Sequence, residues 1–235
     1  MCIRDSANAS GYLDTAYALM VLIVLSGCIA LNLRIQRIRA KLQQQREALA
    51  QALEVNRELA TRDELTGLIN RRAMLDLMAL EHRRSLRSGR PMLLAQLDID
   101  HFKPINDQHG HATGDRALQA FAGTVRASVR DTDVLARWGG EEFVLMLTDT
   151  SADHARELLE RIRQAVQALE IAHSAGSLHL TVSIGLAQHL PGDTVEHTLE
   201  RADQALYHAK ALGRNRVVVA PAGHRTVAAG SNARA

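Results

Sequence analysis

The sequence predicts an α/β domain with a ferredoxin-like, palm-type sandwich, carried behind a long N-terminal helical region. Over residues 71–219, amphipathic helical patterns alternate with apolar runs, and a two-glycine hairpin interrupts this alternation in the middle. Ahead of it, residues 16–60 read as an apolar run followed by a charged helical pattern. The 235 residues therefore have room for one such domain and a short attachment.

The first predicted element is a transmembrane helix over residues 16–33, after a leader of uncertain origin at residues 1–15. The run is almost wholly apolar, and a spanning helix needs about 20 residues. Basic residues follow it directly, at Arg34, Arg37, Arg39 and Lys41. The positive-inside rule then places the following domain in the cytoplasm, attached to the inner membrane. A cleaved signal peptide is the alternative, but its charge would precede the apolar core.

The second predicted element is a charged helix over residues 34–60. Its apolar positions fall on two heptad positions, with Ile35, Leu42, Leu49 and Asn56 on one and Ile38, Gln45, Ala52 and Leu59 on the other. This spacing predicts a parallel coiled coil, and therefore a homodimer. A solvated single helix is the alternative, because Gln45 and Ala52 weaken the seam.

The predicted catalytic domain covers residues 61–219. A helix at 71–89 precedes an apolar strand that begins at Met92 and ends at Asp98, and a loop then runs to Gly114. Later elements are a helix at 115–129, hairpin strands at 134–138 and 143–147, a helix at 151–169 with a Ser151 cap, a strand at 178–187, a helix at 195–212 and a strand at 216–219. Residues 220–235 are small and polar, which predicts a disordered tail.

The hairpin tip is the most informative segment of the chain. Gly139 and Gly140 precede the carboxylate pair Glu141 and Glu142, and an apolar run follows. We expect the glycines to supply positive φ and to let a ligand approach the bare backbone. At such a turn both carboxylates can converge on one cation or phosphate. An ordinary solvated hairpin is the alternative.

Asp98 gives the hairpin a partner. It lies at the carboxyl end of the apolar strand, where ligands of open α/β sheets tend to bind. A strand ending in Asp beside a Glu-Glu turn is the plan of a metal-assisted nucleotidyl-transfer site, in which oxygen ligands hold Mg²⁺. The alternative is a carboxylate that only caps the end of its strand.

Residues 61–219 resemble the GGDEF family of diguanylate cyclases. The resemblance is carried by motifs in the family's order: Asp63–Arg72, Asp98–Asp115, the turn at Gly139–Phe143, Thr181–Gly185, and the helix from Arg201 running into Asn215. The departures are small. Glu141 replaces an Asp of the family's signature, and Ile69 stands where proline is frequent.

The resemblance implies a metal site and a catalytic turn. Asp98, Glu141 and the Ile99 carbonyl would bind Mg²⁺, with Mn²⁺ as an alternative. Glu142 would join the metal shell or help to deprotonate the attacking 3′-hydroxyl. Gly139 and Gly140 would complete the catalytic turn.

The resemblance also implies GTP as the substrate. Asn106 and Asp115 would read guanine, whose N–H groups suit a carboxylate acceptor that adenine would leave unpaired. Capping of the following helix is the alternative for Asp115. The phosphates would be bound by Lys210 and Arg214, and by main-chain amides of Phe102 and Lys103. A lysine near a helix end is otherwise often merely solvated.

A third implied site would bind the product, cyclic di-GMP, as an inhibitor. Arg130 and Asp133 form an Arg-x-x-Asp pattern just before the hairpin, and Arg161 on the next helix would support them. Arg130 would make bidentate bonds to a phosphate or guanine edge, and Asp133 would accept from guanine. Such a pattern also occurs by chance on protein surfaces.

Composition narrows the function. The formal net charge is +2, the aromatic content is 3%, and there are two cysteines, so neither a single-strand nucleic-acid binder nor a disulfide or zinc scaffold is expected. We expect no nucleic-acid partner. Two rivals to the cyclase remain: a non-catalytic receptor for cyclic di-GMP, and a cyclase that acts within one nucleotide.

Overall fold

A computed structural model describes residues 3–173 and 176–221 of the chain. The predicted tail at 220–235 lies outside this part except for its first two residues, and the side chains of the leader at 1–15 also lie outside it. The chain divides into two compact units, residues 1–58 and 59–235, which are described separately.

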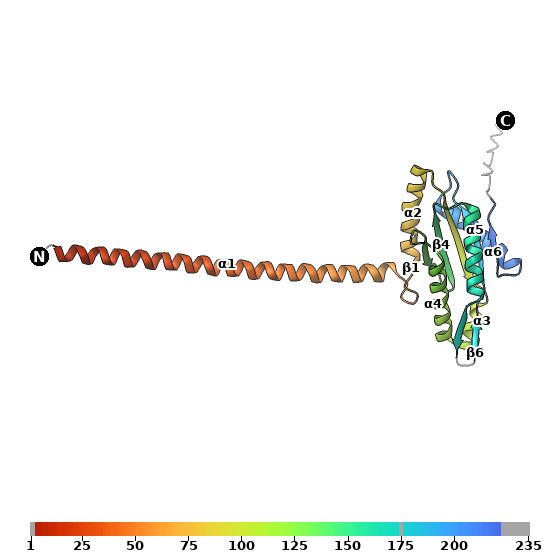
Figure 1. The fold of residues 1–235 in the computed structure, drawn as a ribbon, viewed down its shortest axis with the longest axis horizontal. Helices are drawn as coiled ribbons and strands as arrows, with labels where there is room; N and C mark the ends of the chain where they lie inside the picture. Colours follow the sequence, from red (N-terminus) through yellow and green to blue (C-terminus); the bar gives the residue numbers. More distant parts are fainter. Residues whose placement is uncertain (1–2, 174–175, 222–235) are drawn as a thin grey trace, which may run out of the picture. The chain divides into compact units, whose positions relative to one another are not determined.

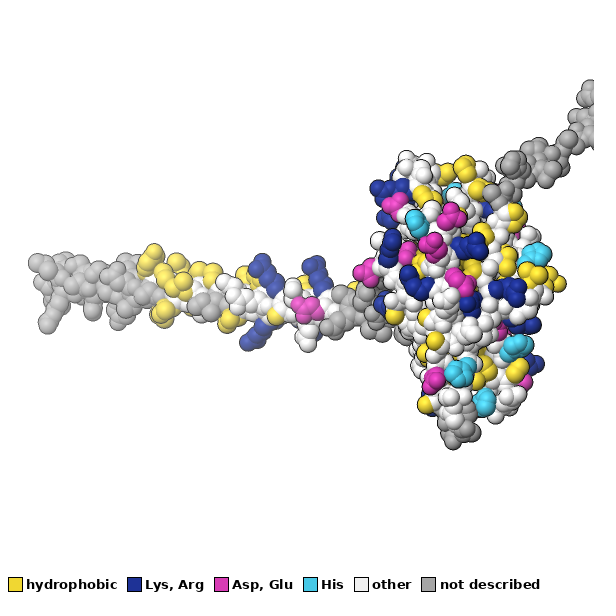
Figure 2. Space-filling model, turned by 45° about the vertical axis from the view of Figure 1, so that its right-hand side comes forward, with side chains coloured by type: hydrophobic (Ala, Val, Ile, Leu, Met, Phe, Trp, Pro, Cys, Tyr) yellow, Lys and Arg dark blue, Asp and Glu magenta, His cyan; other side chains and the backbone are white. Residues whose placement is uncertain are grey.

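The first unit is a single helix, α1 (Ile3–Thr61), whose last residues enter the second unit (Figure 1). Within Leu19–Leu49 it holds a stretch long and apolar enough to cross a membrane, although a signal sequence would meet the same criterion. Apolar side chains from Tyr17 to Leu25 stand exposed. Figure 2 shows this apolar stretch, followed by Lys and Arg side chains further along the helix. An apolar surface of this kind needs lipid or another chain to cover it.

The second unit is built on a six-stranded sheet of order β1-β3-β4-β2-β7-β8, flanked by helices (Figure 1). The central strand β2 is antiparallel to both of its neighbours. The predicted central strand and hairpin are confirmed, and the four inner strands are connected as a βαββαβ unit. The strands are β1 (Ile69–Asn70), β2 (Met92–Ile99), β3 (Val134–Arg137), β4 (Glu142–Thr148), β7 (Val182–Gln188) and β8 (Val217–Val219).

Helices cover both faces of this sheet. One core lies between the sheet and α4 (His111–Ser128) and α5 (Ala152–Gln167). The other lies between the sheet and α2 (Arg71–Ser88) and α6 (Val195–Ala211). The predicted cap of α5 is confirmed, because Ser151 accepts a hydrogen bond from the His154 amide. The sheet is therefore buried on both faces, and its functional groups appear at strand ends.

Three sequence predictions need correction. The loop predicted before Gly114 contains a helix, α3 (Phe102–His109), and α4 begins at His111 rather than at Asp115. The N-cap residue of α3 is His101, which is not a favoured capping residue and makes no side-chain capping hydrogen bond. The start of α3 therefore lacks the usual sequence signal. The strand predicted at 178–187 is two strands, because β6 (Gly176–His179) pairs with β5 (Glu170–His173) in a separate hairpin.

Gly185 sets how closely α6 lies against β7. A Cβ at this position would lie 2.1 Å from the Ala202 carbonyl oxygen and 2.2 Å from the Leu206 amide nitrogen. Only glycine permits this approach of strand and helix backbones. The close packing fixes the course of α6, whose last turn carries Lys210.

Candidate functional site

The two acidic elements predicted to meet do lie side by side. Asp98 of β2 is paired in register with Glu142 of β4, and the Ile99 amide donates to the Glu141 carbonyl at 3.3 Å. Residues directly opposite each other on antiparallel strands point to the same face. Asp98 and Glu142 therefore share one face at one edge of the sheet, and Glu141 precedes Glu142 in the turn at the same edge.

Burial shapes the charges of these carboxyl groups. Asp98 is only 6% exposed, and burial raises its pKa although the cations of Lys210 and Arg214 act in the opposite direction. The pKa of Glu141 is also raised, first by burial and then by the negative charge of Asp98. The negative charge of Asp98 thus disfavours the charged form of Glu141, and a cation bound by these carboxylates would offset that repulsion.

An arginine clamp holds the signature turn. Arg137 donates through Nη2 to the Gly140 carbonyl at 2.8 Å and through Nε to the Gly139 carbonyl at 3.2 Å. Its Nη1 donates to both carboxylate oxygens of Asp63, at 3.2 and 3.1 Å. Burial opposes the charge of Asp63, but hydrogen bonds from Thr66 and from Arg137 outweigh it and lower its pKa. The segment that follows α1 is thereby tied to the turn.

The expected positive φ at the turn is wrong. Neither Gly139 nor Gly140 adopts it. A Cβ on Gly139 would instead lie 2.7 Å from Oε2 of Glu142, whereas one on Gly140 would meet nothing within 4 Å. Gly139 therefore makes room for the side chain of Glu142, and Gly140 leaves the main chain of the turn accessible to a ligand.

Asp98, Glu141 and Glu142 are called the acidic edge below. Lys210, in the last turn of α6, lies beside it. Its ammonium lies 2.8 Å from Oδ2 of Asp98. The side chain of Asp98 is 8% exposed and that of Lys210 is 34% exposed, so the pair sits at the rim of the site. Arg214 lies just beyond α6, and its charge, like that of Lys210, partly opposes the rise that burial causes in the pKa of Asp98. Two cations therefore act on the carboxylate that was predicted to bind metal.

Helices α3 and α4 form the neighbouring part of the site. The amide oxygen of Asn106 lies against Gly114, only 1.9 Å from where a Cβ would stand, and Cζ of Phe102 lies 3.3 Å from the same point. Asp115, one residue further along α4, is exposed. Since α4 begins at His111, Asp115 lies beyond its first residues, and the proposed capping role is wrong.

The N-terminus of α3 offers main-chain donors. Its first intrahelical bond comes from the Ile105 amide to the His101 carbonyl, so the amides of Phe102 and Lys103 are not used within the helix. His101 adopts φ 57°, which turns the chain from β2 into α3. Uncapped amides at a helix start suit an anionic oxygen.

Comparison with known proteins decides the family. The family described as "Diguanylate cyclase, GGDEF domain" matches residues 60–216. The chain belongs to the GGDEF family.

Relatives of this GGDEF chain include a protein named as a diguanylate cyclase and one named as a response regulator. Diguanylate cyclase DgcP of Pseudomonas aeruginosa is 45% identical over 179 residues, which cover 76% of this chain and 27% of that protein. Response regulator PleD of Caulobacter vibrioides is 41% identical over 187 residues, covering 77% and 41% of the two chains. The chain thus spans less than half the length of these relatives.

Solved structures are similar in fold. The coiled coil and GGDEF domain of DgcB from Caulobacter crescentus, in complex with c-di-GMP, gives a TM-score of 0.76 at 35% identity, covering 79% of this chain and 99% of that one. The active GGEEF domain of a diguanylate cyclase from Vibrio cholerae gives 0.62 at 33% identity, covering 66% and 99%.

The predicted product site of this GGDEF domain is a turn before β3. The Arg130 amide donates to Oδ2 of Asp133 at 3.1 Å, and the Asp133 amide donates to the Arg130 carbonyl at 3.0 Å. The other oxygen of Asp133, Oδ1, is buried and has no hydrogen-bond partner among the described residues. A buried acceptor without a donor is costly unless a ligand or water supplies one.

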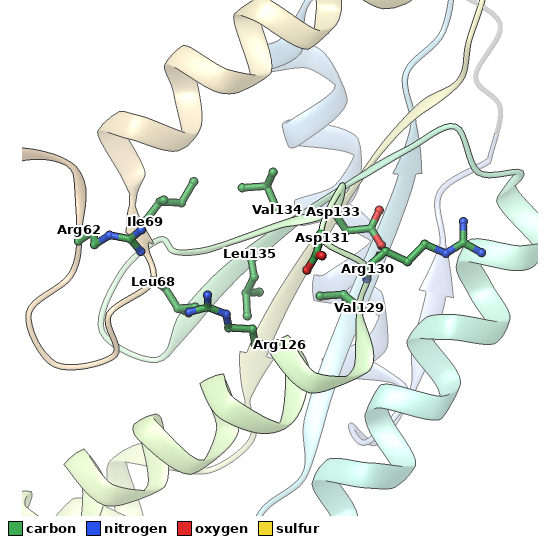
Figure 3. Close-up of a pocket in the computed structure, with 10 residues that line it drawn as sticks. All are labelled: Arg62, Leu68, Ile69, Arg126, Val129, Arg130, Asp131, Asp133, Val134 and Leu135. Carbon is green, nitrogen blue, oxygen red and sulfur yellow. Dashed lines mark hydrogen bonds between the residues drawn. The ribbon is translucent and has the colours of Figure 1, made fainter. Parts of the chain in front are cut away.

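Two hollows flank this turn. One, of about 300 Å³, is drawn in Figure 3, where Asp131 points toward Arg126 while Arg130 points the other way. The other, of about 280 Å³, lies between Arg130 and α5 and includes Arg161. Arg161 donates to the Ser128 carbonyl at 3.2 Å. The three residues predicted for the product site therefore line one hollow.

Sequence reasoning also missed parts of the site. It identified neither the Arg137–Asp63 clamp nor the partners of Asp100, because these contacts join segments 74 to 115 residues apart. Within residues 3–173 and 176–221, no group of three His, Cys, Asp or Glu side chains is placed to hold a metal.

Proposed function

We propose that this chain is a diguanylate cyclase that condenses two GTP molecules into cyclic di-GMP and two pyrophosphates. The observation that carries the proposal is the meeting of Asp98 and the Glu141–Glu142 turn at one sheet edge, with Lys210 and Arg214 beside them. Relatives named as diguanylate cyclases support it. We further assign the βαββαβ unit to the ferredoxin-like, palm-type class.

The acidic edge fits a divalent cation. Asp98, Glu141 and the Ile99 carbonyl present only oxygen atoms, the ligands that Mg²⁺ and Mn²⁺ prefer. Burial raises the pKa of both carboxyl groups, so a bound cation would favour the charged forms that burial disfavours. When bound, the cation would neutralise phosphate charge and lower the pKa of a hydroxyl nucleophile. Lys210, which now pairs with Asp98, would turn to the phosphates.

The remaining residues would bind and orient GTP. Asn106 and Asp115 lie on adjoining helices and would receive the guanine edge. Lys210 and Arg214 would bind the β- and γ-phosphates, while the free amides of Phe102 and Lys103 would bind phosphate oxygens. Polar groups that a bound base covers reject a base that leaves them unpaired.

The reaction needs two such domains. The 3′-oxygen of each GTP would attack the α-phosphorus of the other, its proton passing to Glu142, while pyrophosphate leaves. One site holds one nucleotide, so a homodimer must bring two sites face to face. We propose that residues 34–60 supply this dimer as a coiled coil, as the coiled coil in the solved relative suggests.

We propose that residues 16–33 anchor the protein in the inner membrane, with the GGDEF domain in the cytoplasm. The exposed apolar stretch of α1 and the basic residues after it support this orientation. A fusion reporter at the C-terminus would test it: the proposal requires activity of a cytoplasmic reporter and fails if only a periplasmic reporter is active.

We propose that cyclic di-GMP inhibits the enzyme at Arg130, Asp133 and Arg161. The support is that Oδ1 of Asp133 has no hydrogen-bond partner among the described residues. The carboxylate of Asp133 would turn to accept a guanine N–H, and the guanidinium groups would bind phosphate. Arg130→Ala should leave initial turnover unchanged and raise the product concentration needed for half inhibition by at least about tenfold. An inhibition curve that matches wild type would contradict this.

One incubation separates the cyclase from its rivals. Purified protein is mixed with Mg²⁺ and GTP, or with ATP, and the products are identified by mass. Cyclic di-GMP from GTP alone supports the proposal, and Asp98→Asn should abolish it. Cyclic GMP would indicate chemistry within one nucleotide. Tight binding of cyclic di-GMP without turnover would indicate a receptor.

A further inference from the structure

Asp100 is a buried carboxylate that has no place in the proposed chemistry. It is 4% exposed and lies two residues beyond Asp98. Three donors surround it. Ser183 Oγ donates to Oδ1 at 2.7 Å, while Thr181 Oγ1 at 2.8 Å and the Asn215 main-chain amide at 3.0 Å donate to Oδ2. Through these bonds Asp100 fixes the positions of two side-chain hydroxyls and one main-chain amide.

The segment it holds is the turn after α6. Gly213, Arg214 and Asn215 have φ values of 110°, 63° and 45°, so three consecutive residues lie in the left-handed region. Glycine and asparagine adopt this conformation readily, but for arginine it costs free energy. Such a backbone persists only where its surroundings impose it.

Bonds on both sides define the ends of the turn. On the helix side, the Arg214 amide donates to the Ala209 carbonyl at 3.0 Å. On the sheet side, the Ile184 amide donates to the Arg216 carbonyl at 2.9 Å. Between them, the Asn215 amide reaches Asp100. The carboxylate thus fixes the middle of the turn, next to Arg214.

The side chain of Asn215 adds a second support from α5. Its Oδ1 accepts from Arg163 Nη1 at 2.8 Å, and its Nδ2 donates to Gln167 Oε1 at 3.2 Å. Asn215 is therefore held through its main chain by Asp100, just after β2, and through its side chain by α5. Arg214 is carried between α6 and this doubly held residue.

We propose that Asp100 is the positioning residue for Arg214, and through it for the phosphates of GTP. The charge of Arg214 already acts on Asp98, so its orientation matters to the acidic edge. Asp100 itself does not touch the substrate. The inference rests on the proposed function and adds to it a residue that acts on the substrate only through Arg214.

A carboxylate matches all three partners of Asp100. All three partners of Asp100 are donors, and an ionised carboxylate offers acceptors only. An asparagine keeps only one acceptor oxygen, so its NH₂ group would face a hydroxyl that donates to Asp100 in the wild type. That hydroxyl would have to accept instead and give its own proton to another acceptor, and the fully buried Ser183 has no solvent to take it.

The test is a double-mutant cycle on nucleotide affinity. Binding of a non-reacting α,β-methylene analogue of GTP with Mg²⁺ is measured by calorimetry for wild type, Asp100→Asn, Arg214→Ala and the double variant. We expect Asp100→Asn to weaken binding roughly tenfold, and the double variant to bind like Arg214→Ala alone. Asp76→Asn, an exposed aspartate on α2, is the matched control and should bind like wild type.

Cyclic di-GMP affinity at the Arg130 turn should stay unchanged in Asp100→Asn, because a merely unfolded domain would lose both sites. Losses that multiply in the double variant, or an Asp100→Asn affinity equal to wild type, would overturn the inference. If Asp100→Asn does not fold, Thr181→Val removes one donor and keeps the carboxylate. It should weaken analogue binding by a smaller factor, and an unchanged affinity would likewise overturn the inference. Wild type that fails to bind the analogue would instead refute the proposed function.

Discussion

Gly114→Ala offers a direct test of how the domain would read guanine. The new Cβ would stand 1.9 Å from the amide oxygen of Asn106 and 3.3 Å from the Phe102 ring. The oxygen must retreat by about 1.5 Å to reach an ordinary contact, which exceeds the tolerance of a hydrogen bond. Asn106 would then lose its proposed contact with the base.

A lost partner for a buried guanine donor costs about 1–3 kcal/mol, which corresponds to about 5- to 150-fold weaker binding. The affinity for the methylene analogue of GTP, measured by calorimetry, should fall within this range. The stability of the domain should change little, because alanine favours the helix by about 0.5–1 kcal/mol while Asn106 is displaced.

Gly123→Ala is the matched control on the same helix, since a Cβ there meets nothing within 4 Å. It should raise the free energy of unfolding by about 0.5–1 kcal/mol and leave nucleotide affinity unchanged. A Gly114→Ala protein that binds the analogue as tightly as the control would show that Asn106 does not read guanine.

Three further predictions concern charge and packing. Asp98→Asn should abolish turnover but keep or raise the melting temperature at pH 7, because the raised pKa of Asp98 means that folding disfavours its charged form; a clear loss of stability would contradict this. Burial and the neighbouring His82 lower the pKa of His189, so its stabilising effect should be lost as pH falls below about 6.5, and thermal melts of His189→Gln should show a shallower pH dependence than wild type. Gly185→Ala should lower the free energy of unfolding by about 3 kcal/mol or more in a denaturant titration, because its Cβ meets main-chain atoms of α6 that cannot rotate away, and near-wild-type stability would refute this packing.

Much of the fold follows from local pattern. The apolar run at β2, the two-glycine hairpin and the long amphipathic helices were each predicted, because periodicity and turn residues act over a few positions. The pairing of Asp98 with the Glu-Glu turn was also expected, since both lie at ends of strong elements.

The missed parts depend on distant partners. The helix α3 has only eight residues and no capping side chain at His101, so its sequence resembles a loop. The strand beyond Gly176 looks continuous, but it changes partners near Thr181 because β5 pairs with its first half. Asp100 finds its donors 81 to 115 residues away, and no local signal could have announced them.

Strand β3 has only four residues, with Asp133 before it and the signature turn after it. Its length is about 13 Å, and it is bonded to β1 on one side and to β4 on the other. A slip by one residue would exchange Leu135 and Ala136 between the two cores, whose packing is fitted to each side chain, so this strand has no freedom to slide. A ligand bound at Asp133 would therefore act on the signature turn through a tilt of β3 as a rigid body. The turn at the other end of the strand would move while the pairing register of β3 stays the same.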